Sequence, residues 1–82
     1  MPLKEIHIQY YALLREERGV SQETVSTGAA TAQDLYFELQ KKFKFKLSTD
    51  LLRVSVNDEF LAWETPLKSG DKIVFIPPVA GG

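Results

Sequence analysis

The six residues at the C-terminus have the types and the spacing best suited to chemistry. They are Pro77, Pro78, Val79, Ala80, Gly81 and Gly82. Glycine has no Cβ, so the final glycine pair can enter a slot too narrow for side chains. The two prolines fix φ and favour an extended backbone, which spans roughly 20 Å over six residues. We therefore expect this tail to carry the Gly82 carboxylate into the active site of another protein.

No other group of residues in the sequence has the composition of an active site. His7 is the only histidine and cysteine is absent, which excludes disulfides, thiolate metal sites and a cysteine nucleophile. No carboxylate cluster has metal-site spacing, and no glycine-rich phosphate loop occurs. We interpret His7 as a solvated strand residue and expect no metal and no bound cofactor. The sequence therefore lacks the catalytic groups that an autonomous enzyme would need.

Size and charge limit the remaining classes. The 82 residues suffice for one small domain, 44% of them are hydrophobic and the net charge is −1. This balance gives no general basis for nucleic-acid binding. Residues 41–46 mix lysines with phenylalanines, but the lysines match the C-terminal end of a helix, where cations are favoured. No apolar run is long enough to cross a membrane and no signal segment is seen, so we expect a cytoplasmic protein.

Hydrophobic periodicity predicts an α+β domain over residues 1–76, with the tail at 77–82. Alternating apolar residues predict strands, at residues 3–12, 20–27, 52–56, 60–62 and 72–76. A stripe at helical spacing behind Thr31 predicts one main helix over residues 32–44, and a helical turn is expected at 13–18. One helix on one face of a mixed sheet is the β-grasp, or ubiquitin-like, arrangement.

Strand parity assigns side chains to the two faces of this sheet. The residues expected against the helix are Ile6, Ile8, Tyr10, Val54, Val56, Ile73 and Phe75. The opposite face should be polar, as His7, Gln9, Arg53 and Ser55 are. The exceptions are Tyr11, Phe60, Val74 and Ile76. We expect these four to form an exposed apolar patch beside the tail, which usually marks a protein interface, although scattered exposed apolar residues are also normal.

With these features the sequence resembles the small, sulfur-carrying subunit of molybdopterin synthase, the MoaD family. The resemblance covers most of the chain and is strongest in three segments, residues 56–60 (VNDEF), 65–71 (TPLKSGD) and 74–82 (VFIPPVAGG). Residues 10–16 are also similar to the first strand and turn of that family. The Gly-Asp turn and the final glycine pair are shared with thiamin-type sulfur carriers and ubiquitin-like modifiers, whereas PPVAGG is more specific.

The resemblance implies that the Gly82 carboxylate is the reactive group. A partner adenylating enzyme, related to ubiquitin-activating enzymes, uses ATP to make a Gly82 acyl-adenylate, and sulfur then replaces AMP to give a thiocarboxylate. The large synthase subunit takes up the tail and passes the sulfur to cyclic pyranopterin monophosphate, building the dithiolene of molybdopterin. The implied assembly is a heterotetramer with its catalytic residues on the large subunit. Partner-facing positions of the family fall on Tyr11, Arg15, Phe60 and Ile76.

Three other hypotheses stay open at this point. The chain could serve another sulfur pathway, such as synthesis of the thiamin thiazole. It could be a ubiquitin-like modifier that is attached to lysines. It could also be an interaction module whose tail is chemically inert.

Overall fold

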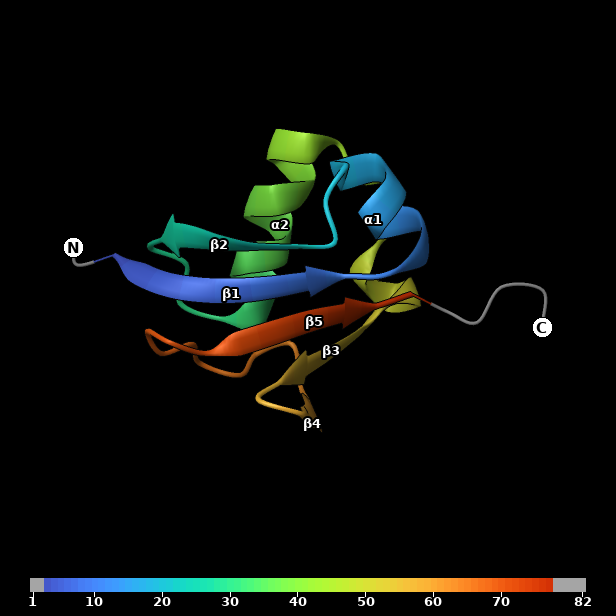
Figure 1. The fold of residues 1–82 in the computed structure, drawn as a ribbon. Helices are drawn as coiled ribbons and strands as arrows, with labels where there is room; N and C mark the ends of the chain where they lie inside the picture. The colour runs from blue at the N-terminus through green and yellow to red at the C-terminus, as the bar shows by residue number, and fades with distance from the viewer. Residues whose placement is uncertain (1–2, 78–82) are drawn as a thin grey trace.

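The computed structural model describes residues 3–77, which form a mixed sheet with one long helix across one face (Figure 1). The strands are β1 (Lys4–Tyr10), β2 (Gln22–Thr27), β3 (Arg53–Val56), β4 (Glu59–Leu61) and β5 (Lys72–Ile76). The helices are α1 (Ala12–Arg18), α2 (Ala32–Phe43) and the short 3-10 turn η1 (Thr49–Leu51). The predicted α+β class and the β-grasp arrangement are confirmed.

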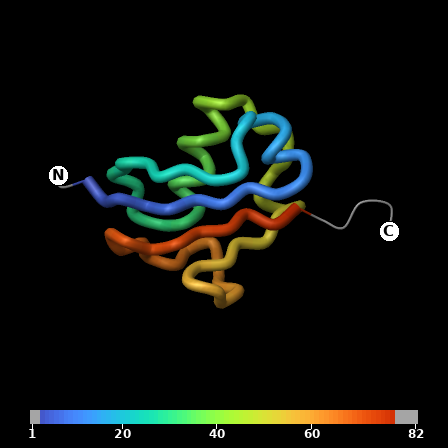
Figure 2. The backbone as a smooth tube through the Cα atoms, in the orientation of Figure 1, coloured from blue at the N-terminus to red at the C-terminus, as the bar shows by residue number. Residues whose placement is uncertain are grey.

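The first and last strands lie side by side in the middle of the sheet. The strand order is β2-β1-β5-β3-β4, and β1 and β5 run parallel, with Ile8 opposite Ile73. All other neighbours are antiparallel. Because β1 and β5 point the same way, their C-terminal ends meet at one end of the sheet, where Tyr10 pairs with Phe75 (Figure 2). The segment that leads to the C-terminus therefore leaves from the centre of the sheet.

Helix α2 begins and ends as its sequence predicts. The Thr31 Oγ1 accepts a hydrogen bond from the Asp34 N–H (3.1 Å), which satisfies a free amide in the first turn. At the other end Lys44 adopts a left-handed conformation (φ 60°) and its N–H donates to the Gln40 carbonyl. The buried face of the helix consists of Ala32, Leu35, Tyr36 and Leu39. These residues pack on the sheet and form one core with it.

Strand parity is confirmed for the helix-facing side of the sheet. The buried residues include all seven that were expected there, Ile6, Ile8, Tyr10, Val54, Val56, Ile73 and Phe75. A cluster of aromatic side chains packs between α2 and the sheet. The Tyr36 ring meets the Phe75 ring edge-on, with 5.1 Å between the ring centroids, and the Trp63 ring stacks on the Phe75 ring at 6.0 Å. Such pairs stabilise a core beyond the area that they bury.

The predicted first strand is too long. It ends at Tyr10, and Ala12 starts α1 with φ 51° instead of continuing the alternation. A positive φ turns the chain out of the sheet, and the alternation of apolar and polar residues cannot predict such a backbone angle. The expected helical turn at residues 13–18 is confirmed as α1, which buries Leu14 and ends at Gly19 (φ 88°).

One expectation for the outer face, the sheet face that points away from α2, is wrong. Val74 was expected in the exposed patch but is only 8% exposed, and its outer-face neighbour Ser55 is only 7% exposed. Both lie in inner strands of the sheet and face each other across the β3–β5 ladder. Side chains of the neighbouring strands cover them on both sides, which sequence parity alone does not reveal.

Candidate functional site

The tail begins where β5 ends. Ile76 is the last residue of β5 and lies opposite Arg53 of β3, and Pro77 follows it half-buried. The other five predicted tail residues lie outside the described part of the chain, namely Pro78, Val79, Ala80, Gly81 and Gly82. Their predicted role stays a prediction, as does the division into a domain and a tail.

The predicted interface residues gather around this end of the outer face. Phe60 is 65% exposed and lies opposite Ser55, which in turn lies opposite Val74. Ile76 is two residues beyond Val74 and therefore shares its face, half-buried. Because the Ser55 side chain is small, it covers little of the Phe60 ring beside it. The structure thus brings Phe60 and Ile76 onto one face.

Tyr11 and Arg15 lie at the junction of β1 and α1. Tyr11 keeps an extended backbone (φ −129°, ψ 155°) as the N-cap of α1 and is 43% exposed. Arg15 is exposed one turn later, and its N–H donates to the Tyr11 carbonyl (3.4 Å). Since the ends of β1 and β5 meet, Tyr11 lies near the start of the tail. We call Tyr11, Phe60 and Ile76 the docking patch.

Sequence parity missed a cleft beside this patch. It has a volume of about 210 Å³ and is lined by Leu52, Arg53, Val54, Phe60, Leu61 and Trp63. Leu61 is 39% exposed because β4 is the edge strand and has no neighbour on its other side. The one available signal was the shortness of the apolar segment after the Asn57-Asp58 turn, which indicates an edge strand.

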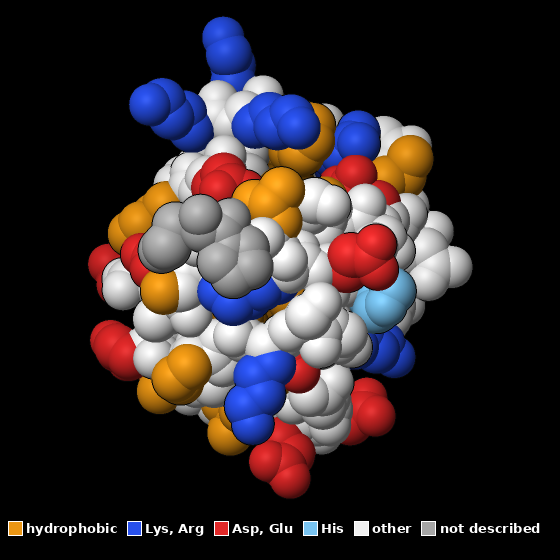
Figure 3. Space-filling view, turned by 90° about the vertical axis from the view of Figure 1, so that its left-hand side faces the viewer, with side chains coloured by type: hydrophobic (Ala, Val, Ile, Leu, Met, Phe, Trp, Pro, Cys, Tyr) orange, Lys and Arg blue, Asp and Glu red, His pale blue; other side chains and the backbone are white. Residues whose placement is uncertain are grey.

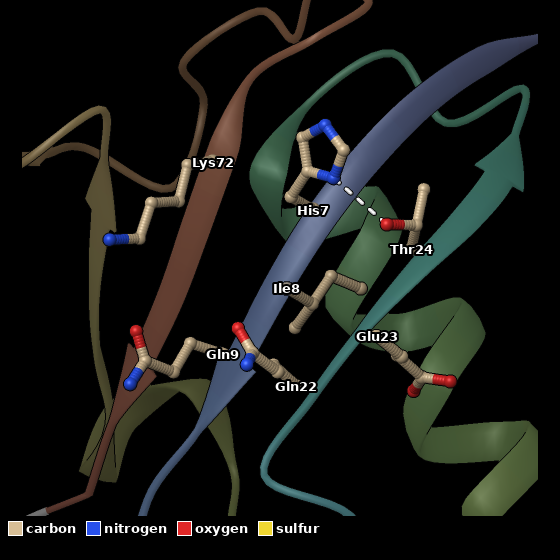
Figure 4. A pocket seen from close by; sticks show the side chains of 7 residues that line it. All are labelled: His7, Ile8, Gln9, Gln22, Glu23, Thr24 and Lys72. Carbon is tan, nitrogen blue, oxygen red and sulfur yellow. Dashed lines mark hydrogen bonds between the residues drawn. The ribbon is translucent and has the colours of Figure 1, made fainter.

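A larger concavity of about 370 Å³ lies elsewhere on the outer face (Figure 4). His7 and Gln9 of β1, Gln22 and Thr24 of β2 and Lys72 of β5 line it. The His7 Nδ1 is 2.8 Å from the Thr24 Oγ1, the contact drawn as a dashed line in Figure 4. A hydroxyl partner and an exposed position agree with a solvated strand histidine, which is visible at the surface in Figure 3.

The strongest electrostatic cluster ties α1 to the sheet. The Glu23 carboxylate accepts two hydrogen bonds from the Arg18 guanidinium (2.8 and 2.9 Å) and one from the Tyr10 hydroxyl (2.6 Å). The hydrogen bonds from Arg18, with a further one from Tyr10, lower the pKa of Glu23. Burial, followed by the hydrogen bond to Glu23, raises the pKa of Tyr10. These groups are held in one arrangement, which suits a structural role.

The lysines predicted near the C-terminal end of the main helix lie there in the structure. Lys41, Lys42 and Lys44 are exposed at the C-terminal end of α2, and Figure 3 shows basic side chains at the top of the molecule, over that end. Their charges complement the free carbonyls of the helix. Among residues 3–77, no three histidine or acidic side chains are grouped closely enough to hold a metal ion, and no helix is long and apolar enough to cross a membrane.

Comparison with known proteins finds relatives over nearly the whole chain. The ThiS family matches residues 8–82. The molybdopterin synthase sulfur carrier subunit of Haemophilus influenzae is 31% identical over 80 residues, which cover 94% of this chain and 99% of that protein. The protein of the same name from Escherichia coli is 28% identical over the same shares of the two chains.

Two solved structures share this fold, and their names describe different functions. One is a complex of subunits 1 and 2 of the molybdopterin-converting factor of Helicobacter pylori, with 28% identity, a TM-score of 0.64, and coverage of 95% of this chain and 99% of that one. The other is SAMP1 of Haloferax volcanii, a small archaeal modifier protein, with 26% identity, a TM-score of 0.77 and the same coverage.

Proposed function

Because the chain belongs to the ThiS family, we propose that it is the sulfur carrier subunit of a molybdopterin synthase. The observation that carries the proposal is its 31% identity to a carrier subunit of that name over almost the full length of both chains. The PPVAGG ending supports it, since this is the more specific part of the resemblance to the molybdopterin carriers. The docking patch beside the start of the tail provides a surface for the protein that receives the sulfur.

The proposed chemistry takes place at the Gly82 carboxyl carbon. A free carboxylate is a poor acyl donor, because attack on it would have to expel oxide. Attack of its oxygen on the α-phosphorus of ATP releases pyrophosphate and leaves an acyl-adenylate with AMP as the leaving group. A persulfide sulfur then displaces AMP, and a thiol cleaves the S–S bond to release the thiocarboxylate. Glycine suits these steps, since it leaves the acyl carbon unhindered.

The proposed partners supply the groups that this chemistry needs. An adenylating enzyme related to ubiquitin-activating enzymes uses ATP to activate the carboxylate, and a persulfide donor supplies the sulfur. The large synthase subunit then binds the charged tail and transfers sulfur to cyclic pyranopterin monophosphate. The relative from Helicobacter pylori is known in complex with its subunit 2, which supports a large-subunit partner. We propose a cytoplasmic heterotetramer in which two carriers flank a dimer of large subunits.

Mass spectrometry tests the central step. The chain is incubated with ATP, its adenylating enzyme and a persulfide donor, and its C-terminal peptide is then measured. We expect one oxygen to be replaced by sulfur at Gly82. If the mass does not change under conditions that charge a known carrier, the proposal is wrong.

The likeness to SAMP1 favours a second candidate, a protein modifier. That function predicts conjugates of higher mass in cell extracts, which disappear when Gly82 is deleted. Complementation separates the two sulfur pathways: the chain is expressed in strains that lack either the molybdopterin carrier or the thiamin carrier, and growth is measured. Rescue of thiamin synthesis alone would refute our choice.

A further inference from the structure

We propose that the cleft between β3 and β4 receives an acidic side chain of the large subunit, and that Arg53 binds its carboxylate. This inference rests on the proposed function, because it concerns the surface on which that partner docks. It adds to that function a chemical requirement on the partner, a carboxylate next to the tail-binding site.

The cleft exists because β4 pairs with only three of the four residues of β3. The last pair between these strands is Val54 with Leu61, whereas β5 stays paired with β3 as far as Arg53 and Ile76. Beyond Leu61 the chain is drawn toward α2, where the Trp63 carbonyl accepts the Gln33 N–H (2.9 Å). The Trp63 ring also stacks on Phe75 in the core. The turn residue Trp63, which lines the cleft, is therefore anchored to both α2 and the core.

The lining of the cleft is divided between apolar walls and one cation. Leu52, Val54, Leu61 and Trp63 provide apolar walls, while Arg53 and Phe60 lie on the strand positions that face away from α2. A volume of about 210 Å³ is enough for one inserted side chain. A glutamate at the outer-face rim of the cleft would lie beside Phe60, where its carboxylate would meet the Arg53 guanidinium in a bidentate pair.

Arg53 has no counter-charge of its own among the described residues. Its side chain makes no ion pair or hydrogen bond within residues 3–77, in contrast to Arg18, which is bound by Glu23. It lies directly opposite Ile76, so a partner that covers the docking patch also covers Arg53. Removing an unpaired guanidinium from water is costly. A matching partner therefore has to offer an anion at this point, and for a protein surface that anion is an aspartate or glutamate.

The test is isothermal titration calorimetry of the full chain with the large synthase subunit from the same organism. Arg53→Gln removes the charge and Arg53→Glu reverses it. The matched controls are Lys72→Gln and Lys72→Glu, because Lys72 is an exposed cation at the opposite end of β5. We expect Arg53→Gln to bind about tenfold more weakly and Arg53→Glu about a hundredfold more weakly, while the Lys72 variants stay within about twofold.

A charge swap identifies the partner residue. Acidic residues of the large subunit are changed one at a time to arginine, and we expect one of these variants to restore binding to Arg53→Glu. The inference is overturned if Arg53→Glu binds within about twofold of the unaltered chain, or if no swap restores binding.

A variant of the docking patch separates this inference from the function on which it rests. If Phe60→Ala weakens binding and Arg53→Glu does not, the interface stands and the role of Arg53 is refuted. If the unaltered chain does not bind the large subunit, the proposed function fails together with the inference. Unfolding curves for each variant confirm that the comparison is made between folded proteins.

Discussion

At the scale of single residues, the Glu23 carboxylate links β2 to both β1 and α1. It accepts hydrogen bonds from Tyr10 and Arg18, and these lower the pKa of Glu23 in the folded protein. A carboxyl group with a lowered folded pKa stabilises the fold above its unfolded pKa, which is about 4.3 for glutamate. That stabilisation is lost as the pH falls through the folded pKa. The hydrogen bonds of Glu23 should therefore matter at neutral pH and fade in acid.

We expect Glu23→Gln to lower the free energy of unfolding by about 1.5–3 kcal/mol at neutral pH, because charge-assisted hydrogen bonds are lost. The difference from the unaltered protein should shrink as the pH falls from about 4.3 through the lowered folded pKa of Glu23, because the wild-type carboxyl group becomes neutral over that range. Urea unfolding at a series of pH values measures this. Glu16→Gln is the control, because Glu16 is exposed. An equal deficit at every pH would contradict the assignment.

We expect deletion of Gly82 to abolish charging with sulfur while leaving the thermal midpoint nearly unchanged. The reason is that the hydrophobic core is formed within residues 3–77. Addition of one serine after Gly82 is the matched variant, since it keeps every native residue but moves the carboxylate. Thiocarboxylate formation by mass spectrometry and melting by circular dichroism are the two readouts. Charging of either variant would show that charging does not require Gly82 as the terminal residue.

At the scale of elements, the order and type of strands and helices could be read from the sequence. Alternation is strong in β1 and β5, and Thr31 with Asp34 marks the start of α2, so local physics determines these elements. The Asn57-Asp58 turn was also predictable, and both residues have positive φ (52° and 71°), as a tight hairpin requires. The end of β1 was not predictable, because it depends on the positive φ of Ala12.

The N-cap of α2 provides a test at this scale. Thr31→Ala removes the hydrogen bond to the Asp34 N–H and should cost about 1 kcal/mol of unfolding free energy. Ser48→Ala is a matched control, because Ser48 is the N-cap of η1 and its side chain makes no capping hydrogen bond. Its effect should stay within about 0.5 kcal/mol. Chemical denaturation of both variants measures the difference, and equal effects would show that the Thr31 bond contributes nothing.

At the scale of the whole molecule, the docking patch could be predicted and the cleft beside it could not. Tyr11, Phe60 and Ile76 break the strand parity, so the sequence alone marks them as unusual. Arg53 obeys parity and looked like an ordinary solvated residue. Its significance comes from its pairing with Ile76 and from the separation of β4 at Leu61. Both depend on contacts between segments that are far apart in the chain, which a local pattern cannot encode.

We expect Phe60→Ala to weaken binding to the large subunit while the domain stays folded. Phe60 is 65% exposed, so its loss removes contact area for a partner and little from the core. An aromatic anchor in an interface contributes about 2 kcal/mol, a weakening of roughly thirtyfold. Phe75→Ala is the contrasting variant, because Phe75 is fully buried and its loss should cost about 3–5 kcal/mol of stability. Unfolding of the Phe60 variant would place that residue in the core.

The central position of β5 has a consequence for biosynthesis. Without β5 the sheet is divided into two separate pairs, β2 with β1 and β3 with β4. On a ribosome, these pairs emerge first and cannot be joined until the last strand has been made. A product that terminates before β5 lacks both the centre of the sheet and the proposed reactive terminus. Since β5 ends at Ile76, six residues before Gly82, a chain that carries the proposed terminus also carries the strand that completes the sheet.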